Sequence, residues 1–475
     1  MDEIMTRLSA KRAKRYDSGI FWDFLTKDRA FFELVGELYD KYPGVPVVGT
    51  VSFLTPALVV RSPENVRQIL AGDTTSFNHR GIDVNGDVDP LADNLLLMNG
   101  IRWKLTRQKM TPLFTAAKLK NMFYIMDRNG RDFVDYIRTK PVSQKAFDTL
   151  NIFCAAAICS SIFGLGTKSS MDSPLLDMAR KVVAPSLAKT LKITLVNTFP
   201  TLFRLLKLKV FVDYEDFFID AMKKVLRARE LDSVRKHDFA DLCLELQRNG
   251  TMKDATSGYE IEPTDELMAA QAFFFIIAGV EPSATAMFFV LFEMAKHPEM
   301  LKKLHAEVDQ TFEECKGDIT YEAIVKMEYL DKVLDESMRM YPPIGSLNRK
   351  CTKNDVLPHG NIKVEEGTLL FIPVYSIHHD PIYYPDPETF DPERFSLEAR
   401  QSRPKYTYLP FGDGHRVCLA ARFARLQMKT GLVHVLRHFA VRTGDAGRPI
   451  KYFKLPVQVT PANVDFEFVE RKLVR

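Results

Sequence analysis

The sequence predicts a mainly α-helical protein with small β-sheets near both ends of the chain. From about residue 101 to 345 apolar side chains recur with the helical period, whereas residues 46–60 and 450–470 show the alternation of short strands. Between residues 361 and 411 proline and aspartate interrupt the chain repeatedly, which is typical of a long irregular connection. We therefore expect a large helical body that carries small sheets.

Composition limits the class of protein. The 475 residues are 46% hydrophobic and 27% charged, which excludes a disordered chain or a coiled coil and provides for a large core. No Gly/Ser-rich linker or fixed repeat marks a boundary, so we expect one domain over residues 1–475. The formal net charge of +4 comes from basic residues interleaved with acidic ones, so nucleic acid is not an expected partner.

Two observations concern the compartment. The six cysteines are dispersed without a CxxC pair, which favours a reducing environment. Residues 1–20 are polar and basic rather than apolar.

Residues 268–295 are apolar enough to mimic a spanning helix, but Glu281 and Pro282 stand at their centre. A charge there costs about 2.5–3.5 kcal/mol in lipid and the proline removes a helix hydrogen bond, so we predict a buried core helix opened at Pro282.

Capping residues and local sequence patterns predict where individual strands and helices begin. Residues 46–60 predict short strands broken at Pro56, and Ser62 is an N-cap for the helix that follows. Thr264 caps the start of the long apolar helix, and a further helix is predicted over residues 418–439.

One short stretch suggests chemistry. Residues 411–426, FGDGHRVCLAARFARL, place Cys418 in a glycine-rich turn before a helix. A thiolate that binds a large flat cofactor needs a backbone able to approach closely, which Gly412 and Gly414 permit. It also needs amide groups and a helix N-terminus that stabilise negative charge. A lone cysteine is more commonly a buried structural residue, so the local pattern leaves both interpretations open.

Three further motifs favour a cofactor site when taken together. Glu336 and Arg339 are three residues apart and share a helix face. Trp103 and Arg107 are four apart, which puts an indole donor beside a guanidinium and suits a carboxylate ligand. Arg394, in PERF, offers a second partner for the Glu336 pair. Singly, each motif is equally explained by a surface pair or an ordinary amphipathic helix.

With these motifs in this order, the chain resembles the cytochrome P-450 family of haem-thiolate monooxygenases over nearly its whole length. The matching positions are Phe411, Gly414, Arg416 and Cys418 of the haem-binding signature, Glu336 and Arg339 of the ExxR helix, Arg394, Trp103, Arg107, and AGVE at 278–281. Residues 103–123 and 378–395 look most like the insect microsomal branch that handles xenobiotics. The resemblance implies a single large fold with haem between the long central helix and the cysteine-bearing helix.

The resemblance also implies a role for each matching residue. Cys418 is expected to be the axial thiolate ligand of a haem b iron. The residues expected to hold the haem propionates are Trp103, Arg107, Arg349 and Arg416. Phe411 is expected to screen the sulfur, and Gly414 to belong to the same haem-binding turn. Glu336, Arg339 and Arg394 are expected to be structural.

The oxygen-binding motif departs from the family pattern. The family has a threonine after the acidic residue, where this chain has Pro282 followed by Ser283. That threonine steadies bound dioxygen and relays protons, whereas proline has neither a hydroxyl nor an N–H. We expect Glu281, Ser283 and water to replace it, although a cap of the broken helix explains Glu281 equally well.

Three functions follow. The favoured one is a monooxygenase that inserts one oxygen atom from O2 into a hydrophobic small molecule, with electrons from NADPH through a reductase. Because of Pro282, the alternative is a dehydratase or isomerase that acts on an aldoxime or hydroperoxide. A non-catalytic haem-binding protein is the third.

Family position implies the pocket and the partners. Residues 191–214 and 80–100 are expected to form its roof, and the expected wall residues are Phe273, Phe274 and Ala278. Residues 191–214 are apolar with interspersed lysines, as a helix pair at a membrane surface would be. NADPH-cytochrome reductase and cytochrome b5 are the expected redox partners, with Lys104, Lys109, Arg422 and Lys429 as candidate docking residues. Members of this branch usually start with a spanning helix that is absent before residue 42, so we expect a trimmed N-terminus and the cytoplasmic face of the endoplasmic reticulum membrane.

Overall fold

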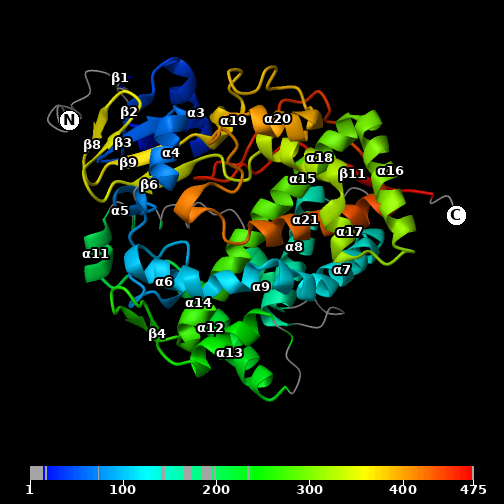
Figure 1. The fold of residues 1–475 in the computed structure, drawn as a ribbon, viewed down its shortest axis with the longest axis horizontal. Coiled ribbons are helices and arrows are strands. Elements are labelled where there is room, and N and C mark those ends of the chain that lie inside the picture. Colours follow the sequence, from blue (N-terminus) through cyan, green and yellow to red (C-terminus); the bar gives the residue numbers. More distant parts are fainter. Residues whose placement is uncertain are drawn as a thin grey trace.

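Helices make up most of the computed structural model, and a sheet lies at one side of them (Figure 1). The structure describes residues 14–15, 19–72, 74–140, 145–164, 174–183, 192, 195–196, 199–232, 236 and 238–472. The predicted mainly α fold with small sheets is confirmed.

The largest sheet joins strands near the N-terminus to strands from residues 347–372. Its five strands, in spatial order, are β1 (Lys14–Arg15), β2 (Val47–Ser52), β3 (Thr55–Val60), β9 (Leu369–Ile372) and β6 (Leu347–Lys350). β3 is antiparallel to β2 and parallel to β9, with Ala57 opposite Leu369. The predicted break at Pro56 was wrong. Pro56 lies within β3 opposite Val51, and because β9 pairs only with residues 57–59, its missing N–H removes no bond to β9.

Three two-stranded sheets complete the β-structure of the described residues. They pair β4 (Met252–Lys253) with β5 (Glu260–Ile261), β7 (Asp355–Leu357) with β8 (Ile362–Val364), and β10 (Phe439–Arg442) with β11 (Glu467–Glu470).

The helices begin where the sequence provides caps. Ser62 Oγ accepts the Asn65 N–H at 3.3 Å and Thr264 Oγ1 accepts the Leu267 N–H at 3.2 Å. The α-helices are α2 (Ile20–Thr26), α3 (Phe31–Lys41), α4 (Pro63–Ala71), α5 (Thr74–Phe77), α6 (Gly100–Met110), α7 (Ala116–Arg138), α8 (Ala146–Phe163), α9 (Pro174–Val183), α11 (Pro200–Leu205), α12 (Val212–Glu230), α13 (Phe239–Arg248), α14 (Asp265–Gly279), α15 (Glu281–Lys296), α16 (Pro298–Glu314), α17 (Tyr321–Lys326), α18 (Glu328–Met340), α19 (Val374–His378), α20 (Leu397–Ser402) and α21 (Ala421–His438). Short 3-10 turns are η1 (Pro90–Ala92), η2 (Thr111–Phe114), η4 (Pro392–Phe395) and η5 (Gly414–Arg416).

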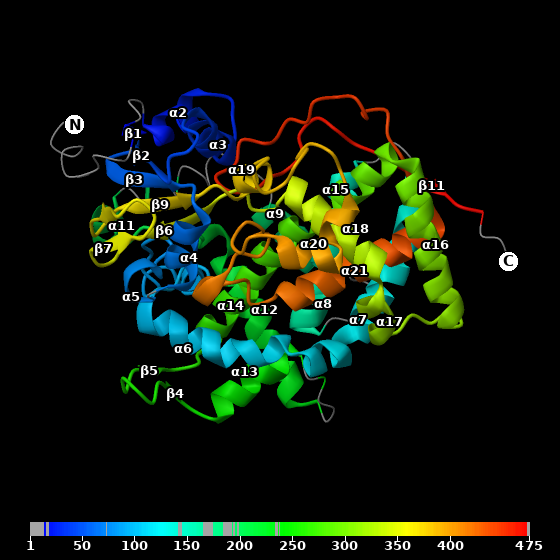
Figure 2. The same ribbon diagram turned by 45° about the horizontal axis from the view of Figure 1, so that its top comes forward.

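The core lies around α8, α14, α15 and α21, which occupy the middle of the helical body (Figures 1 and 2). Phe288, Phe289 and Phe292 of α15 are fully buried there. α8 and the α14–α15 pair are long and apolar enough to cross a membrane, but most of each is covered by other helices. We therefore interpret both as core helices of this fold, in agreement with the prediction for residues 268–295.

Candidate haem-binding site

The loop before α21 presents Cys418. The Cys418 N–H donates to Phe411 O at 2.9 Å, which closes the loop. Gly412 and Gly414 both have φ of +69°, a conformation that other residues rarely adopt. A Cβ on Gly414 would lie 1.8 Å from Leu70 O at the end of α4. The close approach that requires Gly414 is thus to α4, whereas the sequence suggested a close approach to a cofactor.

The surroundings of Cys418 shift the pKa of its thiol in both directions. Its side chain has a large accessible surface, yet burial among protein atoms raises the pKa of its thiol. The Ala420 amide and the positive charges of Arg80 and Arg107 lower the same pKa. These groups stabilise a thiolate, which is the form that binds metals.

Trp103 and Arg416 meet beside the cysteine loop. The Arg416 guanidinium lies 3.9 Å from the centre of the Trp103 ring, and its Nη2 donates to Met98 O at 2.9 Å. Arg107 Nη2 donates to Val417 O at 2.8 Å. The structure therefore brings α6 and the cysteine loop together.

Four arginines form a cationic cluster at this place. Burial and the charges of neighbouring arginines lower the pKa of Arg416 to about 8, and burial, with the charge of Arg80, lowers that of Arg349 to about 9. Burial lowers the pKa of Arg80 to about 10, and burial also lowers the pKa of Arg107. Among the described residues, no carboxylate contributes to the pKa shifts of Arg80, Arg349 or Arg416.

Unsatisfied donors in this cluster fit an anionic ligand. Nη1 of Arg416 and Nε of Arg80 are buried and have no hydrogen-bond partner in the protein. Buried donors without partners are rare because each costs about 1–3 kcal/mol. A ligand with two carboxylates, such as haem, supplies the acceptors and the negative charge that the cluster lacks. Arg80 was missed from the sequence, because no local motif surrounds it.

Glu336 and Arg339 form a fully buried pair in α18. Arg339 Nε and Nη2 each donate to one Glu336 oxygen at 2.8 Å, and both side chains are 0% exposed. Arg394 Nε lies 3.5 Å from Glu336 Oε1, which makes it an ion-pair partner without a hydrogen bond at this nitrogen. All three residues lie together, as expected from the sequence.

His378 connects this pair to the cysteine loop and was not identified from the sequence. Its Nδ1 lies 3.1 Å from Arg339 O, and its Nε2 accepts the Leu409 N–H at 2.8 Å. The acceptor role of Nε2 puts the proton on Nδ1. Burial keeps the pKa of His378 well below its usual value, which favours this neutral form.

The break in the central helix lies at Val280, between α14 and α15. Glu281 is 7% exposed and Ser283 is 3% exposed. Glu281 Oε1 accepts a hydrogen bond from Thr460 Oγ1 at 2.7 Å. Glu281 is therefore not a solvated cap, because its carboxylate is buried against the C-terminal segment.

The predicted pocket wall is only partly accessible. Phe273 is fully buried, with ring centres 5.0 Å from those of Phe211 and Phe218, so it packs α12 onto α14 and does not line open space. Phe274 is half-buried and Ala278 is exposed. Of the predicted roof, residues 191, 193–194 and 197–198 lie outside the described part of the chain.

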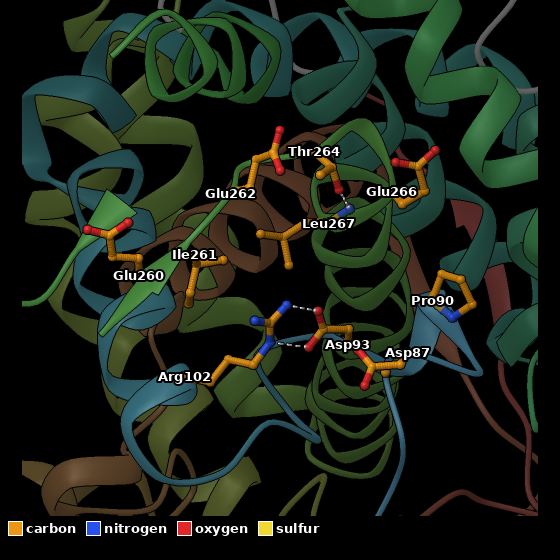
Figure 3. A pocket seen from close by; sticks show the side chains of 11 residues that line it. Asp87, Pro90, Asp93, Arg102, Glu260, Ile261, Glu262, Thr264, Glu266 and Leu267 are labelled. Atoms are coloured by element: carbon orange, nitrogen blue, oxygen red, sulfur yellow. Dashed lines mark hydrogen bonds and ion pairs between the residues drawn. The ribbon is translucent and has the colours of Figure 1, made fainter. Parts of the chain in front are cut away.

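A separate polar pocket lies between η1, β5 and the start of α14, and Figure 3 shows it. Arg102 Nε donates to Asp93 Oδ1 at 2.8 Å inside it. Glu260, Glu262 and Glu266 also line this pocket, together with Asp87, Pro90 and Asp93 from the predicted roof segment 80–100. Its acidic lining is the opposite of the cationic cluster.

The predicted docking residues differ in exposure. Lys104 and Arg422 are exposed and Lys109 is half-buried. Lys429 is buried, with its Nζ 2.9 Å from Asp331 Oδ2 and 3.1 Å from Met327 O. The prediction for Lys429 was wrong, because α21 turns this ammonium towards internal partners.

The fold and this site define a haem-thiolate protein, and comparison with known proteins gives its family. The cytochrome P450 family model matches residues 19–468, so the chain belongs to the cytochrome P450 family. The chain is similar to "Probable cytochrome P450 6a13" of Drosophila melanogaster, with 36% identity over 90% of this chain and 86% of the relative. "Cytochrome P450 6B6" of Helicoverpa armigera is 33% identical over 92% and 88%, and "Cytochrome P450 6A1" of Musca domestica is 36% identical over 86% and 81%.

The expected resemblance to the insect branch is thus confirmed. As a member of this family the protein is an oxidoreductase of the monooxygenase type. Its cofactor is a haem with a cysteine thiolate ligand, and its electrons come from NADPH through a reductase.

Proposed function

We propose that the protein inserts one oxygen atom from O2 into a hydrophobic small molecule, using two electrons from NADPH. Substrate, O2, NADPH and a proton give hydroxylated product, NADP+ and water. The observation that carries this proposal is the Cys418 thiol with the cluster of Arg80, Arg107, Arg349 and Arg416 beside it, of which Arg349 and Arg416 are buried. When bound, the haem supplies the iron at which dioxygen is activated.

The chain's own residues hold that group and control protons. Cys418 provides the sulfur ligand and Phe411 covers it, at the start of the same loop as Gly414. Trp103, Arg107, Arg349, Arg416 and Arg80 hold the two carboxylates. Glu281 and Ser283 are buried beside the helix break and provide the exchangeable protons that Pro282 lacks. Glu336, Arg339 and Arg394 fix η4 to α18.

The substrate is apolar and its pocket borders α14. The exposed surface of Ala278 and the half-buried Phe274 and Ile277 give that helix an apolar accessible side. Such a lining selects hydrophobic molecules by area buried and provides few polar contacts. We propose NADPH-cytochrome reductase and cytochrome b5 as electron donors, docking at the basic side chains of Lys104, Lys109 and Arg422.

A patch of exposed apolar side chains supports a membrane surface as a further partner. The rings of Phe21 and Phe53 lie 5.5 Å apart and those of Phe53 and Phe199 6.0 Å apart, which connects α2, the β2–β3 turn and the segment before α11. The exposed side chains of this patch are Trp22, Phe53, Leu54, Phe199, Leu202, Leu205 and Leu206. Contiguous apolar patches mark interaction sites. We propose the cytoplasmic face of the endoplasmic reticulum membrane, with one catalytic domain over residues 1–475.

Reconstitution with reductase, NADPH and isotopically labelled dioxygen tests this function. Label in an organic product from a panel of apolar compounds is the expected result, and a Cys418→Ala variant should give none. Turnover of aldoximes or hydroperoxides without NADPH, with no labelled product, would instead establish the dehydratase or isomerase that Pro282 suggested.

A further inference from the structure

The central helix is interrupted where its sequence departs from the family pattern. α14 ends at Gly279, α15 begins at Glu281, and Pro282 in the first turn of α15 has no N–H. The Ala284 N–H still bonds to Val280 O at 3.0 Å, so the two helices follow each other directly. Position 282 therefore supplies neither a hydroxyl nor an amide at the break.

A hydroxyl reaches the break from a segment 179 residues further along the chain. Thr460 Oγ1 donates to Glu281 Oε1 at 2.7 Å, and Thr460 is 0% exposed. A buried hydrogen bond to a carboxylate is stronger than one between neutral groups. The contact holds the Glu281 carboxyl group in one place.

The segment that carries Thr460 is itself fixed. The Val459 N–H donates to Pro343 O at 3.2 Å, and the Gly345 N–H donates to Val457 O at 2.8 Å. These bonds attach it to the residues just before β6, the strand that carries Arg349 of the cationic cluster. The hydroxyl therefore comes from a segment that is hydrogen-bonded to the residues before β6.

The other side of the break is fixed as well. A Cβ on Gly279 would lie 2.3 Å from Ile158 Cδ1, so α8 packs directly against the helix end. Ala278, in the same turn, is the one exposed residue of α14. α8 thus packs against the end of α14 two residues before Glu281, and the C-terminal segment contacts Glu281 itself through Thr460.

We propose that Thr460 is a positioning residue of the monooxygenase. Its hydroxyl fixes the Glu281 carboxyl group at the helix break, next to the accessible turn at Ala278, and so keeps that group where it can take up a proton from solvent and pass it to the reaction, which consumes one proton per turnover. The proposal rests on the proposed function and assigns to the C-terminal segment the hydroxyl that Pro282 lacks.

Three variants test it with reductase, NADPH and a substrate found in the labelling experiment. Thr460→Val keeps the shape and removes the donor, Thr460→Ser keeps the donor, and Thr430→Val is the matched control. Thr430 is equally buried, and its Oγ1 donates to Leu426 O at 2.8 Å, within α21. We expect Thr460→Val to lower the product formed per NADPH by about tenfold, with more peroxide and an unchanged KM. Thr460→Ser restores the yield and Thr430→Val does not change it.

A second measurement needs no turnover. The infrared carboxyl band of Glu281, identified by its loss in Glu281→Gln, is expected to shift in Thr460→Val and to return in Thr460→Ser. An unshifted band with an unchanged yield overturns the proposal, as does an equal loss of yield in Thr430→Val. If the wild-type protein gives no labelled product, the proposed function fails, and the band alone decides whether Thr460 holds Glu281.

Discussion

Adding one methyl group at Gly414 tests how the cysteine loop is built. A Cβ at this position would lie 1.8 Å from Leu70 O and 2.4 Å from Leu70 C, both of which are backbone atoms that cannot rotate away. Gly412 provides the matched control, because it has the same φ of +69° and its Cβ would lie 3.7 Å from Leu347 Cδ1, an ordinary contact. The two alanine variants therefore share the backbone strain and differ in the clash.

The expected losses follow from these distances. A non-glycine residue at positive φ costs about 1–2 kcal/mol, and this is the whole expected loss for Gly412→Ala. In Gly414→Ala the loop and α4 must also separate by roughly 1 Å, and overpacking of this kind costs about 1–3 kcal/mol more. Because α4 and the loop both belong to the body of the fold, no hinge relieves the contact.

Urea unfolding of the two variants, at equal haem loading, gives the difference directly. We expect the free energy of unfolding of Gly414→Ala to be lower than that of Gly412→Ala by at least about 1 kcal/mol. The carbon monoxide spectrum should also report a displaced thiolate in Gly414→Ala only. Equal losses in the two variants would show that φ alone requires glycine here and would refute the contact with Leu70.

Three more predictions concern charged groups. Glu336→Gln leaves the buried Arg339 charge without its partner and should lower the free energy of unfolding by about 3–5 kcal/mol, measured by urea unfolding. Arg80→Leu should weaken haem retention, measured by transfer of haem to an acceptor protein, and unchanged retention would remove Arg80 from the site. Burial and the charge of Arg471 lower the pKa of His305 from 6.5 to about 4, so the unfolded chain binds more protons between these pH values. The wild-type melting temperature should therefore fall relative to His305→Asn as pH drops from 6.5 to 4, and parallel curves would contradict this assignment.

The elements that the sequence predicts well are those set by neighbours in the chain. The helical periodicity, the caps at Ser62 and Thr264, and the Glu336–Arg339 pair all depend on spacings of three or four residues. The glycine-rich turn alone left the role of Cys418 open, and the ligand assignment came from the resemblance that this turn shares with the other motifs. These features are visible without knowing what lies across the fold.

The features that sequence reasoning missed depend on distant partners. Arg80 and His378 have no local motif, and only the packing of β6, α19 and the cysteine loop brings them to the site. Lys429 was assigned to the surface because lysine is usually solvated, yet Asp331 compensates its burial. Phe273 faces α12 because three aromatic rings approach it, and the helix period alone does not distinguish this face from the pocket face.

The pairing of β3 with β9 has a consequence for biosynthesis. The ladder between β3 and β9 can form only after residues 369–371 have been synthesised, because they pair with residues 57–59. The cationic cluster likewise combines Arg80 and Arg107 with Arg349 and Arg416. Contacts at such sequence separations form late in folding, after the loop between them has been closed. A nascent chain on the ribosome therefore holds only half of the haem pocket until the segment with Cys418 has emerged. The complete haem site can therefore form only after that segment has emerged.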